Sequence, residues 1–174
     1  MRFIKTFLSI LLVLVLILLI ISFFLPDKVT VERSMVINAP SQEIFEKINT
    51  MRAWQEWSPW FEQDPTMETE FFGPGAGIGS GYKWTSRKLG NGQITITESI
   101  PYRLIGLELI FDQHGKSETG FILQPTREGT LVIWSMDTEM GWNPISRYFG
   151  LFMDLMLGSE FQKGLQNLAR AVER

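Results

Sequence analysis

Residues 130–172 read TLVIWSMDTEMGWNPISRYFGLFMDLMLGSEFQKGLQNLARAV, and this stretch decides the fold. Its first part alternates apolar and polar residues, with Val132, Trp134 and Met136 on one side, as in a strand with one buried face. Asn143 and Pro144 then mark the start of a helix, because asparagine caps helices and proline suits their first turn. Apolar residues recur at helical spacing from there to the end of the chain. The stretch therefore predicts a last strand followed by one long C-terminal helix.

Upstream of this stretch, short alternating segments are separated by turn residues. They predict strands at residues 29–37, 67–72, 82–88, 93–100, 102–112 and 117–124, before the last strand at 130–137. We expect Asn91 and Gly92 to form a hairpin turn, since this pair tolerates positive φ. Each strand has one apolar face, which is typical of an antiparallel sheet covered on one side. The predicted fold class is α+β, with a curved antiparallel sheet of about seven strands around the long C-terminal helix.

The N-terminus carries an apolar segment, residues 7–25, that contains no charged residue. As a helix it would be about 28 Å long, close to the roughly 30 Å hydrocarbon core of a bilayer. The run is longer than the apolar part of a signal peptide, and no small-residue cleavage site follows it. We therefore expect an uncleaved transmembrane anchor, residues 1–26, followed by a single soluble domain, residues 27–174.

The orientation of this anchor depends on the cations at its two ends. Arg2 and Lys5 precede the span, and Lys28 and Arg33 follow it at a similar distance, so the charge bias is small. Short positive N-terminal regions normally stay in the cytoplasm. We expect a single-pass membrane protein with its soluble domain on the extracytoplasmic side.

The composition of the soluble part excludes several classes of function. Without Arg2 and Lys5 the chain has 14 Lys and Arg against 19 Asp and Glu, whereas nucleic-acid binding needs cations that neutralise phosphates. The absence of Cys excludes disulfides, thiol catalysis and thiolate metal sites. His114 is the only histidine and is expected in an exposed turn, so no His-based triad or metal site is possible. We expect no nucleic-acid partner, no metal and no cofactor.

Glycine occupies every odd position from Gly73 to Gly81, which invites comparison with a phosphate-binding loop. The spacing permits no G-x-G-x-x-G motif, and no G-K-[ST] follows. We expect a tightly bent or flexible connection between two strands instead.

Carboxylates are the remaining option for catalysis. Glu98 falls on the same predicted strand face as Ile94, Ile96 and Ile100, which would point it into an apolar cavity. Burial would raise the pKa of such a carboxyl and suit it to general acid–base work. The alternative is a Glu at a strand end that reaches solvent or pairs with Arg103, and we favour it because no second acid or base has a matching spacing.

Large apolar side chains are the best candidates for a binding site. Aromatic rings offer a ligand contact area at low entropic cost, and methionine adapts to irregular surfaces. Ordinary core packing is the alternative for each residue taken singly. The predicted ligand-binding residues are Trp57, Trp60, Trp84, Phe121, Trp134, Phe149 and Met153.

The order of predicted elements is one strand, two short helices, six strands and a long C-terminal helix. Distinctive stretches within it are residues 31–40 with Ile44 and Phe45, residues 54–60 with three tryptophans, Gly129 and Thr130 with Trp134, Met153 and Asp154 with Gly158, and Phe161 with Gly164 and Leu165. On these grounds residues 29–174 resemble the START-like (SRPBCC) superfamily, and within it the polyketide cyclase/dehydrase and lipid-transport branch. The resemblance implies a helix-grip fold with a deep cavity that takes sterols, lipids, polyketides or other apolar molecules.

Proteins of this superfamily include carriers, cyclases, chaperone regulators and stand-alone binding domains, so the resemblance leaves enzyme activity open. We expect a membrane-anchored, non-catalytic binding domain whose partner is an apolar small molecule or lipid. The alternatives are a cyclase/dehydratase-like enzyme that uses a pocket carboxylate, and a protein-interaction module of the chaperone-regulator kind. The sequence identifies neither the ligand nor any protein partner.

Overall fold

The computed structural model describes residues 2–112 and 115–173, so the expectation for His114 lies outside the described residues. The strands are β1 (Lys28–Ile37), β2 (Glu68–Phe72), β3 (Gly81–Ser86), β4 (Gly90–Ile100), β5 (Leu104–Phe111), β6 (Gly115–Thr126) and β7 (Gly129–Glu139). The helices are α1 (Arg2–Ser22), α2 (Ser41–Asn49), the 3-10 helix η1 (Met51–Ala53), α3 (Trp54–Trp57), α4 (Pro59–Gln63) and α5 (Pro144–Val172). This order confirms the predicted α+β fold class.

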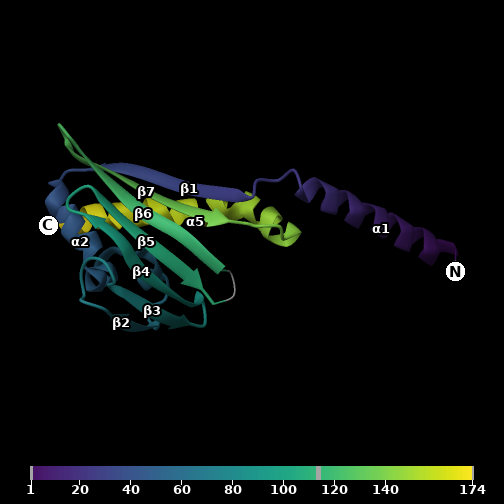
Figure 1. The fold of residues 1–174 in the computed structure, drawn as a ribbon, viewed down its shortest axis with the longest axis horizontal. Coiled ribbons are helices and arrows are strands. Elements are labelled where there is room, and N and C mark those ends of the chain that lie inside the picture. Colours follow the sequence, from purple (N-terminus) through teal and green to yellow (C-terminus); the bar gives the residue numbers. More distant parts are fainter. Residues whose placement is uncertain (1, 113–114, 174) are drawn as a thin grey trace.

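All seven strands form one antiparallel sheet in the order β1-β7-β6-β5-β4-β3-β2. Figure 1 shows this sheet curving around α5, with α2 beside the C-terminal end of that helix. The Asn143 side chain caps α5 by accepting a hydrogen bond from the backbone N–H of Ile145 at 2.9 Å, as the sequence predicts. The long helix thus starts where the capping signal stands and runs along the concave face of the sheet.

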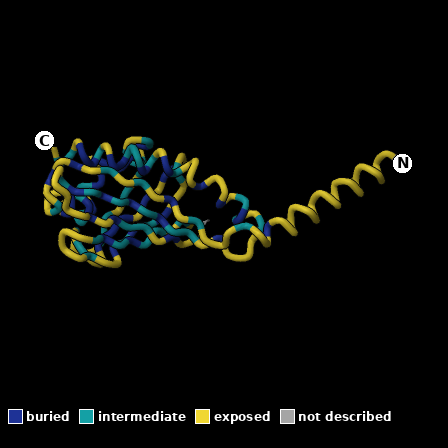
Figure 2. Tube along the Cα trace, turned by 90° about the horizontal axis from the view of Figure 1, so that it is seen from above, coloured by how far each residue is buried: buried dark blue, intermediate teal, exposed yellow. Residues whose placement is uncertain are grey.

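The N-terminal helix α1 extends away from this body, and its residues are exposed up to its last turn (Figure 2). The segment of residues 3–22 within α1 is long enough and apolar enough to cross a membrane. A helix that is apolar on every side and covered on none is unlike the amphipathic helices of the domain. The structure therefore confirms one N-terminal apolar helix that extends away from the sheet and meets α5 only near its own C-terminal end.

The joint between α1 and the domain is made by one buried cation. Arg147, only 7% exposed, donates hydrogen bonds to the carbonyls of Ser22, Phe23 and Leu25 at 3.1–3.3 Å, and its Nε donates to that of Gly141 at 2.8 Å. The last carbonyls of a helix have no partner within the helix and carry partial negative charge. The guanidinium of Arg147 in α5 therefore provides hydrogen-bond donors for carbonyls at the C-terminal end of α1.

The β3–β4 hairpin turn differs from the prediction. Asn91 and Gly92 lie inside β4, and the turn comprises the three residues before Gly90, which pairs with Ser86. Gly90 has a φ of 74°, so it supplies the positive φ that a three-residue hairpin loop needs. The turn was wrongly predicted at Asn91 and Gly92, because Gly90, two residues before Gly92, supplies the positive φ instead.

A β-bulge in β4 changes which of its side chains face the core, so the inward faces predicted by alternation are only partly correct. The β4–β5 register shifts between Ile96 and Glu98, so the inward alternation of Ile94 and Ile96 breaks there. Glu98 and Ile100 are consequently exposed, although period-two counting puts them on the buried face. Glu98 therefore reaches solvent, which is the alternative that the sequence analysis favours over a position in the cavity.

The glycine run forms a compact turn rather than a phosphate loop. Gly73, Gly75, Gly77 and Gly79 all have φ between 74° and 94°, a region that other residues rarely adopt. The N–H of Gly79 donates to the carbonyl of Ile96 at 2.9 Å, which ties the turn to β4. The tightly bent connection predicted between β2 and β3 is present.

Candidate ligand-binding cavity

A cavity of about 390 Å³ lies between the concave face of the sheet, α4 and the middle of α5. Its walls are mainly aromatic and aliphatic, with a few polar groups, as in small-molecule sites generally. The lining residues are Trp54, Trp60, Gln63, Met67, Tyr82, Trp84, Leu89, Ile94, Leu109, Phe111, Thr119, Trp134, Met136, Met156, Leu157, Glu160 and Phe161. Residues of the sheet, of α3 and α4 and of the middle of α5 therefore surround the cavity.

Trp134 is the centre of one wall. Its indole stacks on Phe161 of α5, with ring centroids 4.3 Å apart, and on Phe121 of β6 at 4.7 Å. Trp57 and Trp60 meet its edge at 5.8 and 5.6 Å. The indole N–H donates to the Thr119 hydroxyl at 3.1 Å, which satisfies its polar atom within the wall. These contacts fix the ring, so this wall is rigid before any ligand arrives.

The opposite wall is built on β3. Tyr82 contacts Trp84 with ring centroids 6.1 Å apart, and Trp84 meets the edge of Phe111 at 5.5 Å. Burial raises the pKa of the Tyr82 hydroxyl above its ordinary value, so the group stays neutral. The hydroxyl forms no hydrogen bond with any described residue, which leaves it available to a bound molecule.

The other polar groups of the cavity are already paired. Gln63 Nε2 donates to Glu160 Oε2 and so links α4 to α5. The Thr119 hydroxyl donates to the Ser135 carbonyl at 2.8 Å while it accepts from Trp134. A ligand therefore meets apolar walls with polar groups from Tyr82 and from the Gln63–Glu160 pair.

The predicted ligand-binding residues separate into three groups. Trp60, Trp84 and Trp134 line the cavity. Trp57 and Phe121 are fully buried and pack against Trp134 from behind, so they support the wall without forming its surface. The structure brings these five aromatic residues into the same part of the core.

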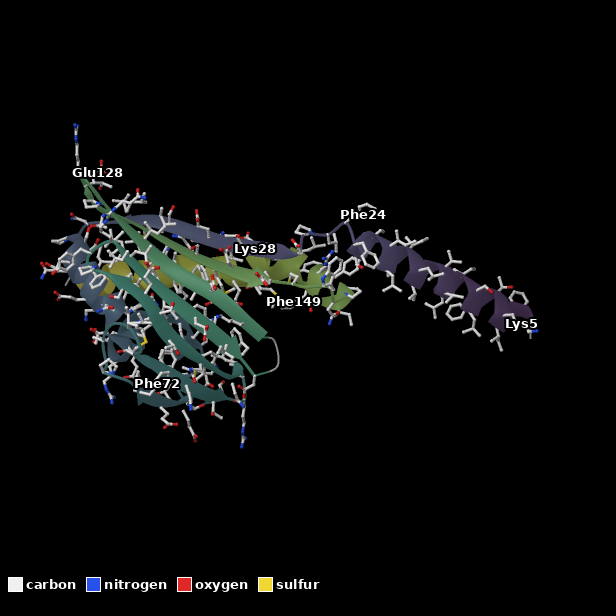
Figure 3. All side chains as sticks on the ribbon, in the orientation of Figure 1. Lys5, Phe24, Lys28, Phe72, Glu128 and Phe149 are labelled. Atoms are coloured by element: carbon white, nitrogen blue, oxygen red, sulfur yellow. The ribbon has the colours of Figure 1, made fainter. Side chains whose placement is uncertain are left out.

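Phe149 and Met153 lie outside the cavity, against the expectation from the sequence. Phe149 is exposed near the start of α5 (Figure 3), and Met153 is buried one turn further on, but neither is a lining residue. Helical periodicity finds the two apolar faces of α5 but does not tell which one meets the sheet. The helix lines the cavity only with four later residues, Met156, Leu157, Glu160 and Phe161.

Sequence reasoning missed Trp54, Gln63, Met67 and Glu160 as lining residues. Trp54 was visible as one of three tryptophans at three-residue spacing, but the break between α3 and α4 decides which of them face the cavity. The Gln63–Glu160 contact joins residues 97 positions apart, so no local sequence pattern could predict it. Glu98, the weak candidate for catalysis, is exposed on β4 and is not part of the lining.

A larger hollow of about 810 Å³ lies on the surface between α2, α3, α4 and the end of α5. Its charged groups are engaged with each other, since Lys47 pairs with Glu56 at 2.5 Å and Lys163 pairs with Glu62 at 3.1 Å. We regard the smaller cavity as the candidate site, because its lining is mainly aromatic and aliphatic. No three His, Asp or Glu residues come together as a metal site within residues 2–112 and 115–173.

A sheet that grips a helix over an apolar cavity defines a helix-grip protein. The family model described as polyketide cyclase / dehydrase and lipid transport matches residues 28–173, so the chain belongs to this family. Comparison with curated protein sequences gave no match.

Solved structures share the fold at low sequence identity. A Chromobacterium violaceum protein is 18% identical, with a TM-score of 0.58 over 84% of this chain and 99% of its own. The Aha1 dimer from Colwellia psychrerythraea is 17% identical, with a TM-score of 0.58 over 83% of this chain and 96% of its own. StfQ, the di-domain ARO/CYC of the steffimycin biosynthetic pathway, is 12% identical, with a TM-score of 0.61 over 84% of this chain and 51% of its own.

Proposed function

We propose that this protein is a membrane-anchored binding domain that holds a hydrophobic small molecule or a lipid between its sheet and α5. The observation that carries the proposal is the 390 Å³ cavity, whose walls are aromatic and prearranged. This volume falls within the roughly 300–1,000 Å³ typical of small-molecule pockets. The family description, which includes lipid transport, supports the same class of ligand.

Binding would work by burial. Each Å² of apolar ligand surface removed from water contributes about 25 cal/mol, and rigid walls reduce the entropic cost of association. The free Tyr82 hydroxyl and the Gln63–Glu160 pair would orient a ligand that carries one polar end. The expected ligand is therefore mainly apolar with a small number of hydrogen-bonding groups.

We further propose that α1 crosses the bilayer once and holds the domain, residues 27–174, on the extracytoplasmic side. The length and apolar character of residues 3–22, which are exposed from residue 3 to residue 21, support the span. The anchor would keep the cavity within reach of a membrane-derived ligand. A cleaved signal sequence is the competing interpretation, and an intact N-terminus on the mature protein would exclude it.

Glu98, the candidate for the enzyme alternative, lies outside the cavity, and Glu160, paired with Gln63, is the one carboxylate among the lining residues. The interaction-module alternative predicts a filled core and a large exposed apolar patch, and of these two features only the exposed apolar patch, on α5, is present. Binding of an apolar molecule is therefore the function that we propose for the cavity.

The proposal is tested by native mass spectrometry of residues 27–174, followed by solvent extraction of any co-purified molecule. A bound apolar molecule, lost when Trp134 is replaced by Asp but kept when the exposed Ile110 is replaced by Asp, supports the cavity as its site. Circular dichroism confirms that both variants are folded. A domain that stays unliganded after incubation with a total lipid extract contradicts the proposal.

A further inference from the structure

The outer surface of α5 changes character halfway along the helix. Its first half exposes six large apolar side chains, each between 46% and 79% accessible, which we call the apolar face. They are Ile145, Phe149, Leu151, Phe152, Leu155 and Met156. The second half of the same helix exposes polar side chains instead, among them Gln166 and Arg170.

Apart from Met156, which also lines the cavity, the residues of the apolar face do not contribute to the core of the domain. The buried side of the same helical segment already packs inward through Gly150, Met153 and Gly158, and it holds Arg147 against the end of α1. Apolar surface clustered on one exposed side is costly in water and marks a contact with another apolar body. The apolar face of α5 therefore needs a partner that covers it.

The start of α5 lies next to the C-terminal end of α1. The Tyr148 hydroxyl donates to the carbonyl of Leu18 at 2.8 Å, one helical turn before α1 ends. Arg147 meets the last carbonyls of α1, and both Phe24 and Phe149 lie at the end of the domain that faces α1 (Figure 3). If α1 spans the bilayer, the first turn of α5 lies at the depth of the membrane surface.

The residues around this point are those that prefer the membrane–water boundary. Trp142 is 81% exposed, and its ring lies 5.3 Å from the Arg147 guanidinium. Tryptophan and tyrosine gather at the headgroup level because their rings are amphipathic. The apolar half of α5 is the half next to α1, and the polar half is the distant one (Figure 1).

We propose that the apolar face of α5, from Ile145 to Met156, docks on the lipid bilayer that holds α1. The proposal rests on the membrane anchor of the proposed function. Continuity with the anchor favours the bilayer over a second copy of the chain or a partner protein. Met156 belongs both to the apolar face and to the cavity lining, so the docked surface is continuous with the binding site.

The chain has no cysteine, so single-cysteine probes need no altered background. We would prepare the full-length variants Ile145→Cys, Phe152→Cys and Gln166→Cys, label each with a nitrobenzoxadiazole fluorophore, and reconstitute them in phosphatidylcholine–phosphatidylglycerol vesicles. All three sites lie on one helix, and Gln166 is the exposed control on its polar half. Doxyl-labelled phospholipid should quench most of the emission at positions 145 and 152 and leave position 166 unchanged. A blue-shifted emission at the first two sites would accompany the quenching.

A fourth variant, Leu14→Cys in α1, separates this inference from the anchor on which it depends. Quenching at position 14 with none at positions 145 and 152 overturns the docking while the anchor stands. The absence of quenching at position 14 contradicts the anchor itself. Unquenched but blue-shifted labels at 145 and 152, with disulfide cross-links between unlabelled chains, would assign the face to a second copy and also overturn the proposal.

Discussion

Trp134 of β7 and Phe161 of α5 stack nearly parallel, with ring centroids 4.3 Å apart and planes inclined by 8°. This contact joins β7, the strand next to the edge strand β1, to α5 and forms part of the cavity wall. Both rings are almost fully buried. The same pair therefore contributes to the stability of the fold and to the shape of the site.

Phe161→Ala should destabilise the domain by about 3–5 kcal/mol, because it removes a buried ring and enlarges the cavity. Phe152→Ala is the matched control on the same helix, since Phe152 is 55% exposed, and it should change stability by no more than about 0.5 kcal/mol. Urea unfolding of the detergent-solubilised chain, followed by circular dichroism, measures both. Equal effects at the two positions would show that the stacked pair does not hold α5 to the sheet.

Two glycines of α5 should respond differently to the same substitution. A Cβ at Gly164 would stand 2.5 Å from Cζ3 of the packed Trp134 ring, whereas one at Gly158 would meet the movable guanidinium of Arg33. Alanine favours a helix by about 1 kcal/mol over glycine, but overpacking a core costs about 1–3 kcal/mol. We expect Gly164→Ala to destabilise the domain and Gly158→Ala to be close to neutral. Thermal unfolding of both variants checks this, and a stabilised Gly164→Ala would contradict the close contact.

The fold was predictable because its signals are local. Alternation located the strands, and the Asn143–Pro144 pair located the start of α5, since each depends on residues close in sequence. The β4 bulge was not predictable, because it arises from pairing with β5 and has no signature within β4. It turns Glu98 to the outside, although simple alternation along β4 places this residue on the inner face.

The site was predictable only in part. The aromatic residues on the strands, Trp84 and Trp134, were found because strand alternation gives their direction. Phe149 was misplaced because α5 has an apolar surface on two sides, and only the tertiary structure tells which side meets the sheet. An apolar helix surface that exceeds what the sheet can cover is the signal that points to a second partner.

Asp64 should give the domain a pH-dependent stability in the acidic range. Its carboxylate accepts hydrogen bonds from the hydroxyls of Ser86 and Thr66, both at 2.6 Å, and these lower the pKa of Asp64. The ionised group therefore stabilises the folded state above the unfolded pKa of about 3.9, and this contribution is lost as pH falls through the folded pKa.

Asp64→Asn should accordingly be less stable than the natural chain at pH 7, and the difference should shrink below about pH 4. Urea unfolding at pH 7, 5 and 3 measures it, with Glu128→Gln in the exposed β6–β7 turn as the control. A difference that does not change with pH would mean that the carboxylate charge has no part in the network.

Arg147→Met should loosen the joint between α1 and α5. The substitution removes hydrogen bonds from a cation to the carbonyls of Ser22, Phe23 and Leu25, and such bonds contribute about 1.5–3 kcal/mol each. Chymotryptic cleavage after Phe23 and Phe24 in detergent should become about tenfold faster or more, since each 1.4 kcal/mol is a factor of ten.

Arg33→Met is the control for this joint. It removes an arginine that pairs with Asp154 at 2.7 Å on the domain surface, away from the carbonyls that Arg147 holds. Its cleavage rate should match that of the natural chain. Equal acceleration in both variants would indicate a general loosening of the domain rather than loss of the joint.

The most direct test of the cavity as a binding site is a fluorescence titration of residues 27–174 with 1-anilinonaphthalene-8-sulfonate. It compares the natural domain with Leu109→Trp, which would fill the cavity from β5, and with Ile110→Trp, which adds the same ring at the next residue on the outer face. We predict saturable binding to the natural domain and to Ile110→Trp, with affinity lowered at least about tenfold in Leu109→Trp, because a filled pocket loses the buried apolar contact area. Equal affinity in all three proteins would contradict binding in the cavity.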